Sequence, residues 1–81
     1  MTDYKTIVRE SFDNKPCIPM GEYRFLINPL TEQIPATSAE LLSAAADWLV
    51  EAGDYADATK IAGEEDKGAI LVAAVALKTG L

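Results

Sequence analysis

The sequence predicts an α/β fold in which short strands alternate with helices. Apolar residues recur at helical spacing in three separate segments. Two shorter stretches of apolar and aromatic residues are typical of strands, and prolines and glycines separate the segments. In chain order we expect a helix at 3–12, a strand at 22–28, a helix at 38–52, a strand at 59–63 and a helix at 68–79.

The N-terminal half is predicted to hold one helix, one strand and two loops. Thr2 or Asp3 can cap the first helix, whose apolar residues are spaced for one face. Residues 14–21 contain two prolines and a glycine and are expected to form a loop, with Cys17 as a passive thiol. Residues 28–35 are bracketed by prolines, so we expect a second, partly extended loop whose polar groups are free to face a ligand.

The strand at 22–28 is predicted from Tyr23, Phe25 and Ile27, which alternate onto one side. We expect Tyr23 and Phe25 to pack against a neighbouring strand. In the loop that follows, Asn28 and Thr31 are expected to cap the local turn, although both could also bond to a ligand.

The second helix is marked by a capping-box pair, Thr37 with Glu40, and by Gly53 at its end. Trp48 lies on its apolar stripe, which favours a core position over a stacking platform. The last helix is apolar on every face from Ala69 to Leu77, which indicates burial. That run is far shorter than the roughly 20 residues needed to cross a bilayer. The one or two strands predicted before it are too few to bury all its faces.

Composition excludes several classes of function. The 81 residues contain one cysteine and no histidine, so the chain can form neither an internal disulfide nor a Ser-His or Cys-His catalytic pair. A net charge of −6 opposes non-specific binding to nucleic acid or to an anionic membrane, so any phosphate site must be local. Charges are spread through the first 15 residues and leave no apolar signal region, from which we expect a cytoplasmic protein.

Residues 63–68 lie where a strand leads into a helix, the usual place for a ligand in an α/β sheet. Gly63 and Gly68 permit unusual backbone angles and close approach of a ligand, and Lys67 adds a positive charge. Backbone amides with an ammonium group suit pyrophosphate or another phosphate. Three neighbouring carboxylates would require magnesium as a counter-ion. The alternative is that these acids only complement the helix N-terminus and that Lys67 is solvated surface.

Two segments resemble the type I phosphoribosyltransferases, in particular the purine enzymes of the adenine and archaeal hypoxanthine/guanine type. Residues 60–81, KIAGEEDKGAILVAAVALKTGL, are similar to the family segment in which a strand leads through an acidic turn into an Ala/Leu-rich helix ending in Thr-Gly. Residues 23–35, YRFLINPLTEQIP, are similar to the aromatic strand and Pro-bracketed loop that precede the first core helix of the archaeal members.

The resemblance implies a Rossmann-like parallel-sheet domain that transfers a phosphoribosyl group from phosphoribosyl pyrophosphate to a purine base, with magnesium. It implies that Asp66, Lys67 and Gly68 contact pyrophosphate and that Glu65 matches the family acid, supporting the turn or magnesium. It would place residues 23–28 near a base-binding hood, with 1–36 as a hood-like segment and 37–81 as the start of the α/β core. Catalytic residues and a protein metal site are not assigned.

The family's central signature, two adjacent acids followed by a Thr/Gly-rich phosphate loop, does not occur in the 81 residues. We therefore expect the N-terminal part of a phosphoribosyltransferase, a single incomplete domain that is inactive alone and forms a homo-oligomer such as a dimer in its longer form. The competing hypothesis is a small, acidic, non-catalytic module that self-associates through its apolar C-terminal helix.

Overall fold

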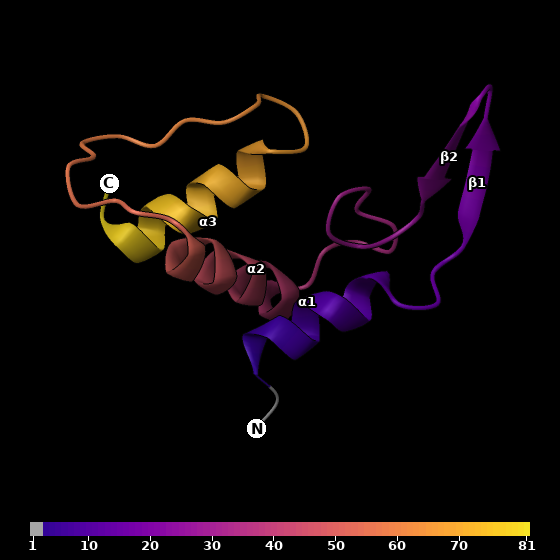
Figure 1. The fold of residues 1–81 in the computed structure, drawn as a ribbon, viewed down its shortest axis with the longest axis horizontal. Helices are drawn as coiled ribbons and strands as arrows, with labels where there is room; N and C mark the ends of the chain where they lie inside the picture. The colour runs from indigo at the N-terminus through magenta and orange to yellow at the C-terminus, as the bar shows by residue number, and fades with distance from the viewer. Residues whose placement is uncertain (1–2) are drawn as a thin grey trace.

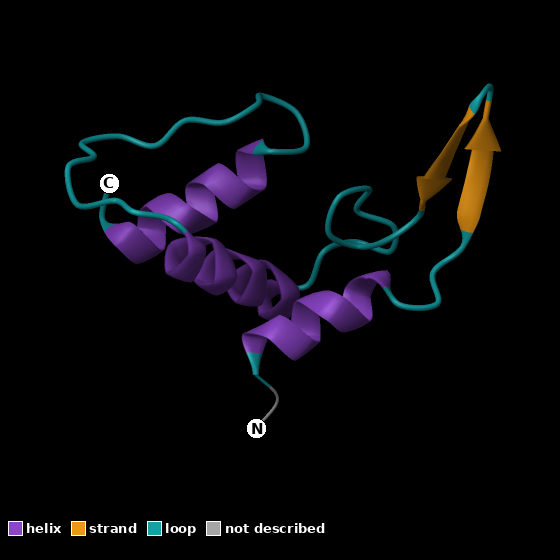
Figure 2. Ribbon diagram, in the orientation of Figure 1, coloured by secondary structure: helices purple, strands orange, loops and turns teal. Residues whose placement is uncertain are grey.

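The computed structural model describes residues 3–81, which form three helices and one β-hairpin joined by long loops (Figures 1 and 2). The elements follow the order helix, strand, strand, helix, helix. Their bounds are α1 Tyr4–Phe12, β1 Cys17–Met20, β2 Tyr23–Leu26, α2 Ala39–Ala52 and α3 Ala69–Thr79. The three predicted helices are confirmed, each beginning within one residue of its expected position.

Local capping explains where the helices begin and end. Asp3 caps α1, its carboxylate accepting a hydrogen bond from the Thr6 amide at 3.0 Å. The predicted cap of α2 is wrong by one residue, because the Ser38 hydroxyl oxygen accepts from the Leu41 amide at 3.0 Å. Thr37 instead donates its hydroxyl hydrogen to the Pro29 carbonyl oxygen, tying the preceding loop to the start of the helix.

The sheet differs from the predicted parallel one. β1 and β2 pair antiparallel, with Met20 opposite Tyr23 and Ile18 opposite Phe25. β1 occupies the segment predicted to be a loop, and Cys17 lies in it as an exposed free thiol. Gly21 has a φ of +65°, which a tight two-residue hairpin turn with glycine in its first central position requires.

The predicted strand at 59–63 is wrong. These residues have no regular secondary structure and lie within the long connection between α2 and α3 (Figure 1). A short apolar stretch becomes a strand only when another strand satisfies its amides and carbonyls. Within residues 3–81 the only strand pairing is that of the hairpin. The parallel sheet is therefore not present in the described part of the chain.

The core lies where α1 and α3 both pack against α2 (Figure 1). Its centre is small, and the alanines of α2 allow the helices to approach closely. The buried apolar residues are Leu30, Leu41, Ala44, Ala45, Ala46 and Val75, with Ile7, Val8, Phe12 and Leu71 packed beside them. Trp48 is half-buried at the edge of this core, and the charged ends of Lys5 and Arg9 lie over its ring at 5.7 and 5.3 Å from the centroid.

Two apolar surfaces remain exposed on this fold. In α3 only Val75 is buried, and Leu77 is 87% exposed, so the elements present do not cover this helix. The hairpin projects away from the helices (Figure 1) and exposes four large apolar side chains, Ile18, Met20, Tyr23 and Phe25. Tyr23 and Phe25 thus have the expected cross-strand partners, but their side chains remain exposed to solvent. No helix among residues 3–81 has the length and apolar character needed to cross a membrane.

Candidate phosphate-binding turn

The turn before α3 is organised by the side chain of Glu64. One carboxylate oxygen, Oε1, accepts hydrogen bonds from the amide of Asp66 at 2.6 Å and from the amide of Gly68 at 3.2 Å. Gly68 is the N-cap residue of α3 and has no side chain to cap the helix. Glu64 therefore supplies from outside the helix the acceptor that a Ser or Asp cap would otherwise provide.

The two glycines of the turn serve close packing rather than unusual backbone angles. Gly68 has an ordinary right-handed conformation with a φ of −77°, and among the described residues the positive-φ glycines are Gly21 and Gly80. A Cβ atom added to Gly63 would lie 2.1 Å from Cγ2 of Val72, which is far inside the contact distance of two non-bonded carbon atoms. Gly63 thus allows the loop to lie directly against α3, while the expectation of special backbone angles is wrong.

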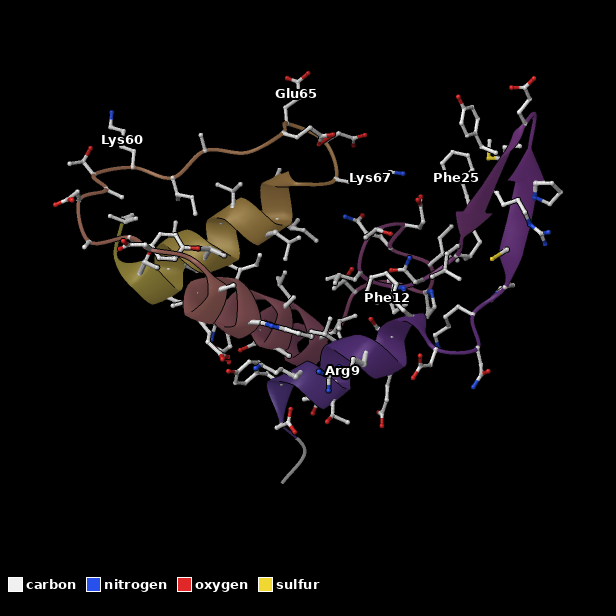
Figure 3. All side chains as sticks on the ribbon, in the orientation of Figure 1. Arg9, Phe12, Phe25, Lys60, Glu65 and Lys67 are labelled. Carbon is white, nitrogen blue, oxygen red and sulfur yellow. The ribbon has the colours of Figure 1, made fainter. Side chains whose placement is uncertain are left out.

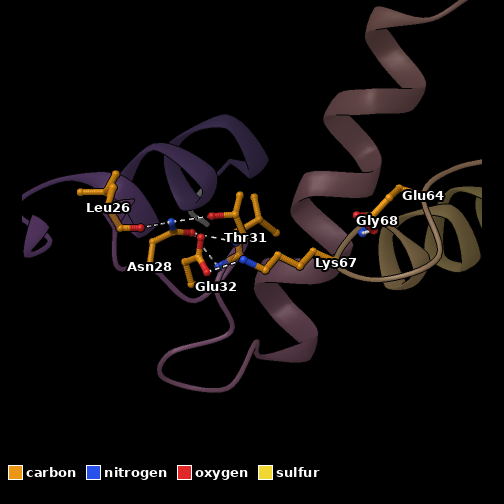
Figure 4. Close-up of polar contacts among 8 residues, drawn as sticks. Leu26, Asn28, Thr31, Glu32, Glu64, Lys67 and Gly68 are labelled. Carbon is orange, nitrogen blue, oxygen red and sulfur yellow. Dashed lines mark hydrogen bonds and ion pairs between the residues drawn. The ribbon is translucent and has the colours of Figure 1, made fainter. Parts of the chain in front are cut away.

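Lys67 joins this turn to the loop that follows β2. Its ammonium nitrogen lies 2.6 Å from Oε2 of Glu32 and donates a hydrogen bond to it (Figure 4). This hydrogen bond raises the pKa of Lys67 above its ordinary value of 10.5, and the charges of Glu32, Asp66 and Glu64 act in the same direction. In Figure 3, Lys67 extends toward the loop after β2, whereas Glu65 and Lys60 point away from the helices.

The loop after β2 is closed by Asn28, whose side chain is almost completely buried at 1% exposure. Its Oδ1 accepts from the amides of Leu30 at 2.9 Å and Thr31 at 2.8 Å. Its amide nitrogen donates to the Leu26 carbonyl at 3.0 Å and to the Thr31 hydroxyl at 2.8 Å (Figure 4). Asn28 and Thr31 therefore cap the local turn, as predicted, and present Glu32 to Lys67.

Three of the four predicted site residues, Asp66, Lys67 and Gly68, are consecutive in this turn. The amides of Asp66 and Gly68 face a common acceptor, Oε1 of Glu64, whereas the ammonium group of Lys67 extends away from them to Glu32 (Figure 4). The fourth residue, Glu65, is exposed and points outward (Figure 3). Sequence reasoning did not find Glu32, because nothing in the sequence shows that a loop 35 residues earlier lies beside Lys67.

The acidic side chains of the turn do not gather into a metal site. Within residues 3–81 no group of three or more Asp, Glu, Cys or His side chains is arranged to hold a metal ion. Magnesium prefers six oxygen ligands in octahedral geometry. The protein residues described here therefore do not form a magnesium site on their own, and most ligands of such an ion would have to come from a phosphate group and water.

Comparison with known proteins relates the chain to archaeal enzymes of one kind. The hypoxanthine/guanine phosphoribosyltransferase of Methanohalophilus mahii is 33% identical over 75 residues, which cover 93% of this chain and 39% of the relative. Those of Methanothermobacter marburgensis and Methanothermobacter thermautotrophicus are 39% and 38% identical over 74 residues, covering 89% and 91% of this chain and 38% of each relative.

Two further comparisons gave no match. No family model matches the chain, and no solved structure matches it. The chain spans about two fifths of the length of the curated relatives that it matches. The resemblance read from residues 23–35 and 60–81 is confirmed: over about nine tenths of its length, the chain is similar to archaeal hypoxanthine/guanine phosphoribosyltransferases.

Proposed function

We propose that the chain supplies part of a purine phosphoribosyltransferase, which transfers a phosphoribosyl group from phosphoribosyl pyrophosphate to a purine base of the hypoxanthine/guanine class. The observation that carries this proposal is the similarity to the archaeal enzymes over nine tenths of the chain. The reaction requires no nucleophilic serine or histidine, which agrees with a sequence that contains no histidine. The protein's task is to position two substrates and to stabilise a departing pyrophosphate.

In this proposal the turn before α3 binds the pyrophosphate group. Lys67 neutralises its charge, and the amides of Asp66 and Gly68 donate hydrogen bonds to its oxygens. The turn is suited to this role because both amides already bond to a carboxylate oxygen, which shows that they point toward a common acceptor position. Glu65 is proposed to act at the margin of the site, near the solvent.

Magnesium enters the proposal only as the counter-ion of phosphoribosyl pyrophosphate. The described residues form no metal-binding cluster. The contribution of the chain in this proposal is therefore limited to its own amides and its lysine.

A chimera tests the function directly. The matched 75-residue stretch of the Methanohalophilus mahii relative is replaced by the corresponding residues of this chain, and phosphoribosyl transfer to hypoxanthine and guanine is measured. We expect an active chimera whose rate falls by about tenfold or more with Lys67→Ala, because a charge-assisted hydrogen bond to the leaving group is lost.

Lys60→Ala is the matched control for this chimera. Lys60 is an exposed lysine on the same loop that points away from the helices (Figure 3), and we expect its removal to leave the rate unchanged. A folded but inactive chimera would contradict the proposed function. Equal losses with the two lysine variants would contradict the role of Lys67.

A second candidate function is a non-catalytic module that self-associates through α3. The exposed Leu77 and the single buried residue of α3 favour it. Residues of α1, α2, α3 and the loop after β2 also line an apolar groove of about 300 Å³. Light scattering across a concentration series distinguishes the candidates: this reading predicts an oligomer that Leu77→Lys dissociates, whereas a monomer would contradict it.

A further inference from the structure

The β-hairpin carries its four large exposed apolar side chains on one face. Side chains alternate between the two faces of a strand. The pairing of Ile18 with Phe25 and of Met20 with Tyr23 therefore places all four on the same side. They are between 39% and 71% exposed, and the hairpin projects away from the helices (Figure 1). Two strands without cover are only marginally stable in water, whereas three or more strands with an apolar face can be stable.

The two edges of the hairpin differ in what they offer to a further strand. The Ile27 amide donates to the Pro16 carbonyl at 2.8 Å, and hydrogen-bonded pairs alternate along an antiparallel ladder. The backbone groups of Pro19 on β1, and of Arg24 and Leu26 on β2, therefore point away from the facing strand. Pro19 has no amide hydrogen, which blocks the β1 edge. The β2 edge offers the amides of Arg24 and Leu26 and the Arg24 carbonyl.

We propose that β2 pairs antiparallel with β2 of a second copy of this chain, to form a four-stranded sheet across a two-fold axis. With Phe25 opposite Phe25 of the second copy, Arg24 and Leu26 exchange hydrogen bonds twice across the axis. The Leu26 carbonyl accepts from the Asn28 side chain at 3.0 Å, and its second lone pair is left for the Arg24 amide. The neighbouring alignment, with Arg24 opposite Arg24, would bring like charges together.

A second copy fits this edge better than an unrelated strand because one contact closes the assembly. Pairing about a two-fold axis uses the open β2 edge of both copies and leaves the two proline-blocked β1 strands outside. Residues 17–26 contain one acidic and one basic residue, although the whole chain has a net charge of −6. The hairpins therefore approach without net repulsion. This interface does not involve the turn before α3, so the inference goes beyond the proposed function.

Sedimentation equilibrium of the 81-residue chain tests the pairing. The contact is smaller than a standard interface of about 800 Å² per partner, so we expect a dimer with a dissociation constant on the order of 10 μM. Arg24→Pro removes an outward amide but no bond within the hairpin, and Pro19, directly opposite, shows that the hairpin accommodates proline at such a position. We expect this variant to weaken the dimer by about tenfold or more, because two hydrogen bonds are lost across the axis.

Two control variants separate this interface from charge effects and from α3. Arg24→Gln removes the same charge but keeps the amide, and Leu77→Lys changes the exposed face of α3. We expect both variants to dimerise as the wild type does. A wild type that stays monomeric far above the expected dissociation constant would overturn the inference. Equal weakening by the two Arg24 variants, or a dimer that Leu77→Lys dissociates and Arg24→Pro does not, would overturn it as well.

A distance measurement tests the arrangement without any change at the β2 edge. Cys17 is the only cysteine, lies exposed in β1 and can carry a nitroxide label. In the four-stranded sheet the two Cys17 Cα atoms lie roughly 15 Å apart, across three strand spacings. Double electron–electron resonance should therefore show a short distance in the wild type that disappears in Arg24→Pro. A wild-type dimer without this short distance would contradict pairing through β2.

Discussion

Two turns of this molecule use the same local device in opposite surroundings. Oδ1 of Asn28 accepts from two backbone amides downstream, and Oε1 of Glu64 does the same before α3. Asn28 is 1% exposed, whereas Glu64 is exposed to solvent. A buried acceptor has no replacement when it is lost, but an exposed one can be exchanged for water or an anion. The first turn thus depends on its own side chain, whereas the second can exchange its acceptor.

The largest difference is expected when both side chains are truncated. Asn28→Ala leaves the amides of Leu30 and Thr31 without their acceptor inside the protein, which costs about 2–3 kcal/mol of the free energy of unfolding. Glu64→Ala removes the acceptor that caps α3, but water can replace it at this exposed position, so we expect a smaller loss of about 0.5–1 kcal/mol. Urea denaturation measures both values. Similar losses of unfolding free energy for the two variants would show that the difference in burial does not make one turn more important for stability than the other.

An intermediate effect is expected where the second turn lies against α3. Gly63→Ala places a methyl group 2.1 Å from Cγ2 of Val72, so the Val72 side chain, the loop or the helix must shift. We expect a loss of about 1–3 kcal/mol in the free energy of unfolding, as in other overpacked contacts. The matched test is the double variant with Val72→Ala, which provides room for the methyl group. If Gly63→Ala alone leaves the free energy of unfolding unchanged, the turn is not held against α3.

The smallest effect concerns the link between the turns. Because Glu32 raises the pKa of Lys67, the stabilisation from this pair is fully present below the ordinary pKa of 10.5 and is lost as pH rises through the raised folded value. We expect Glu32→Gln to lower the pKa of Lys67 toward 10.5. An NMR titration of the Lys67 side chain at alkaline pH measures it. An unchanged pKa in the variant would show that Glu32 and Lys67 do not pair in solution.

The helices could be predicted from sequence because their signals are local. Apolar spacing and a cap lie within a few residues of each helix end, as with Asp3 for α1 and Gly80, at a φ of +79°, for α3. The exception is the N-cap of α2, for which two neighbouring hydroxyl residues are candidates. Because the Thr37 hydroxyl donates its hydrogen bond to the Pro29 carbonyl, Ser38 caps the helix instead.

The strands were predicted less well because pairing depends on a partner. Pro19 indicated a loop, but both strands of a two-stranded sheet are edge strands, where proline is tolerated. Residues 59–63 indicated a strand, but no other strand of the described chain lies beside them. At the candidate site, the sequence located the turn at Lys67, while its contact with Glu32 depends on tertiary packing. The roles of Glu65, Asp66, Lys67 and Gly68 in binding stay predictions.

Amide NMR of the 81-residue chain during titration with magnesium phosphoribosyl pyrophosphate tests the phosphate role of the turn most directly. We predict saturable shifts of the Asp66 and Gly68 amides, with the amides of β1 and β2 unchanged and the response lost in Lys67→Ala. Shifts that spare Asp66 and Gly68, or that persist in the Lys67 variant, would contradict a pyrophosphate site at this turn.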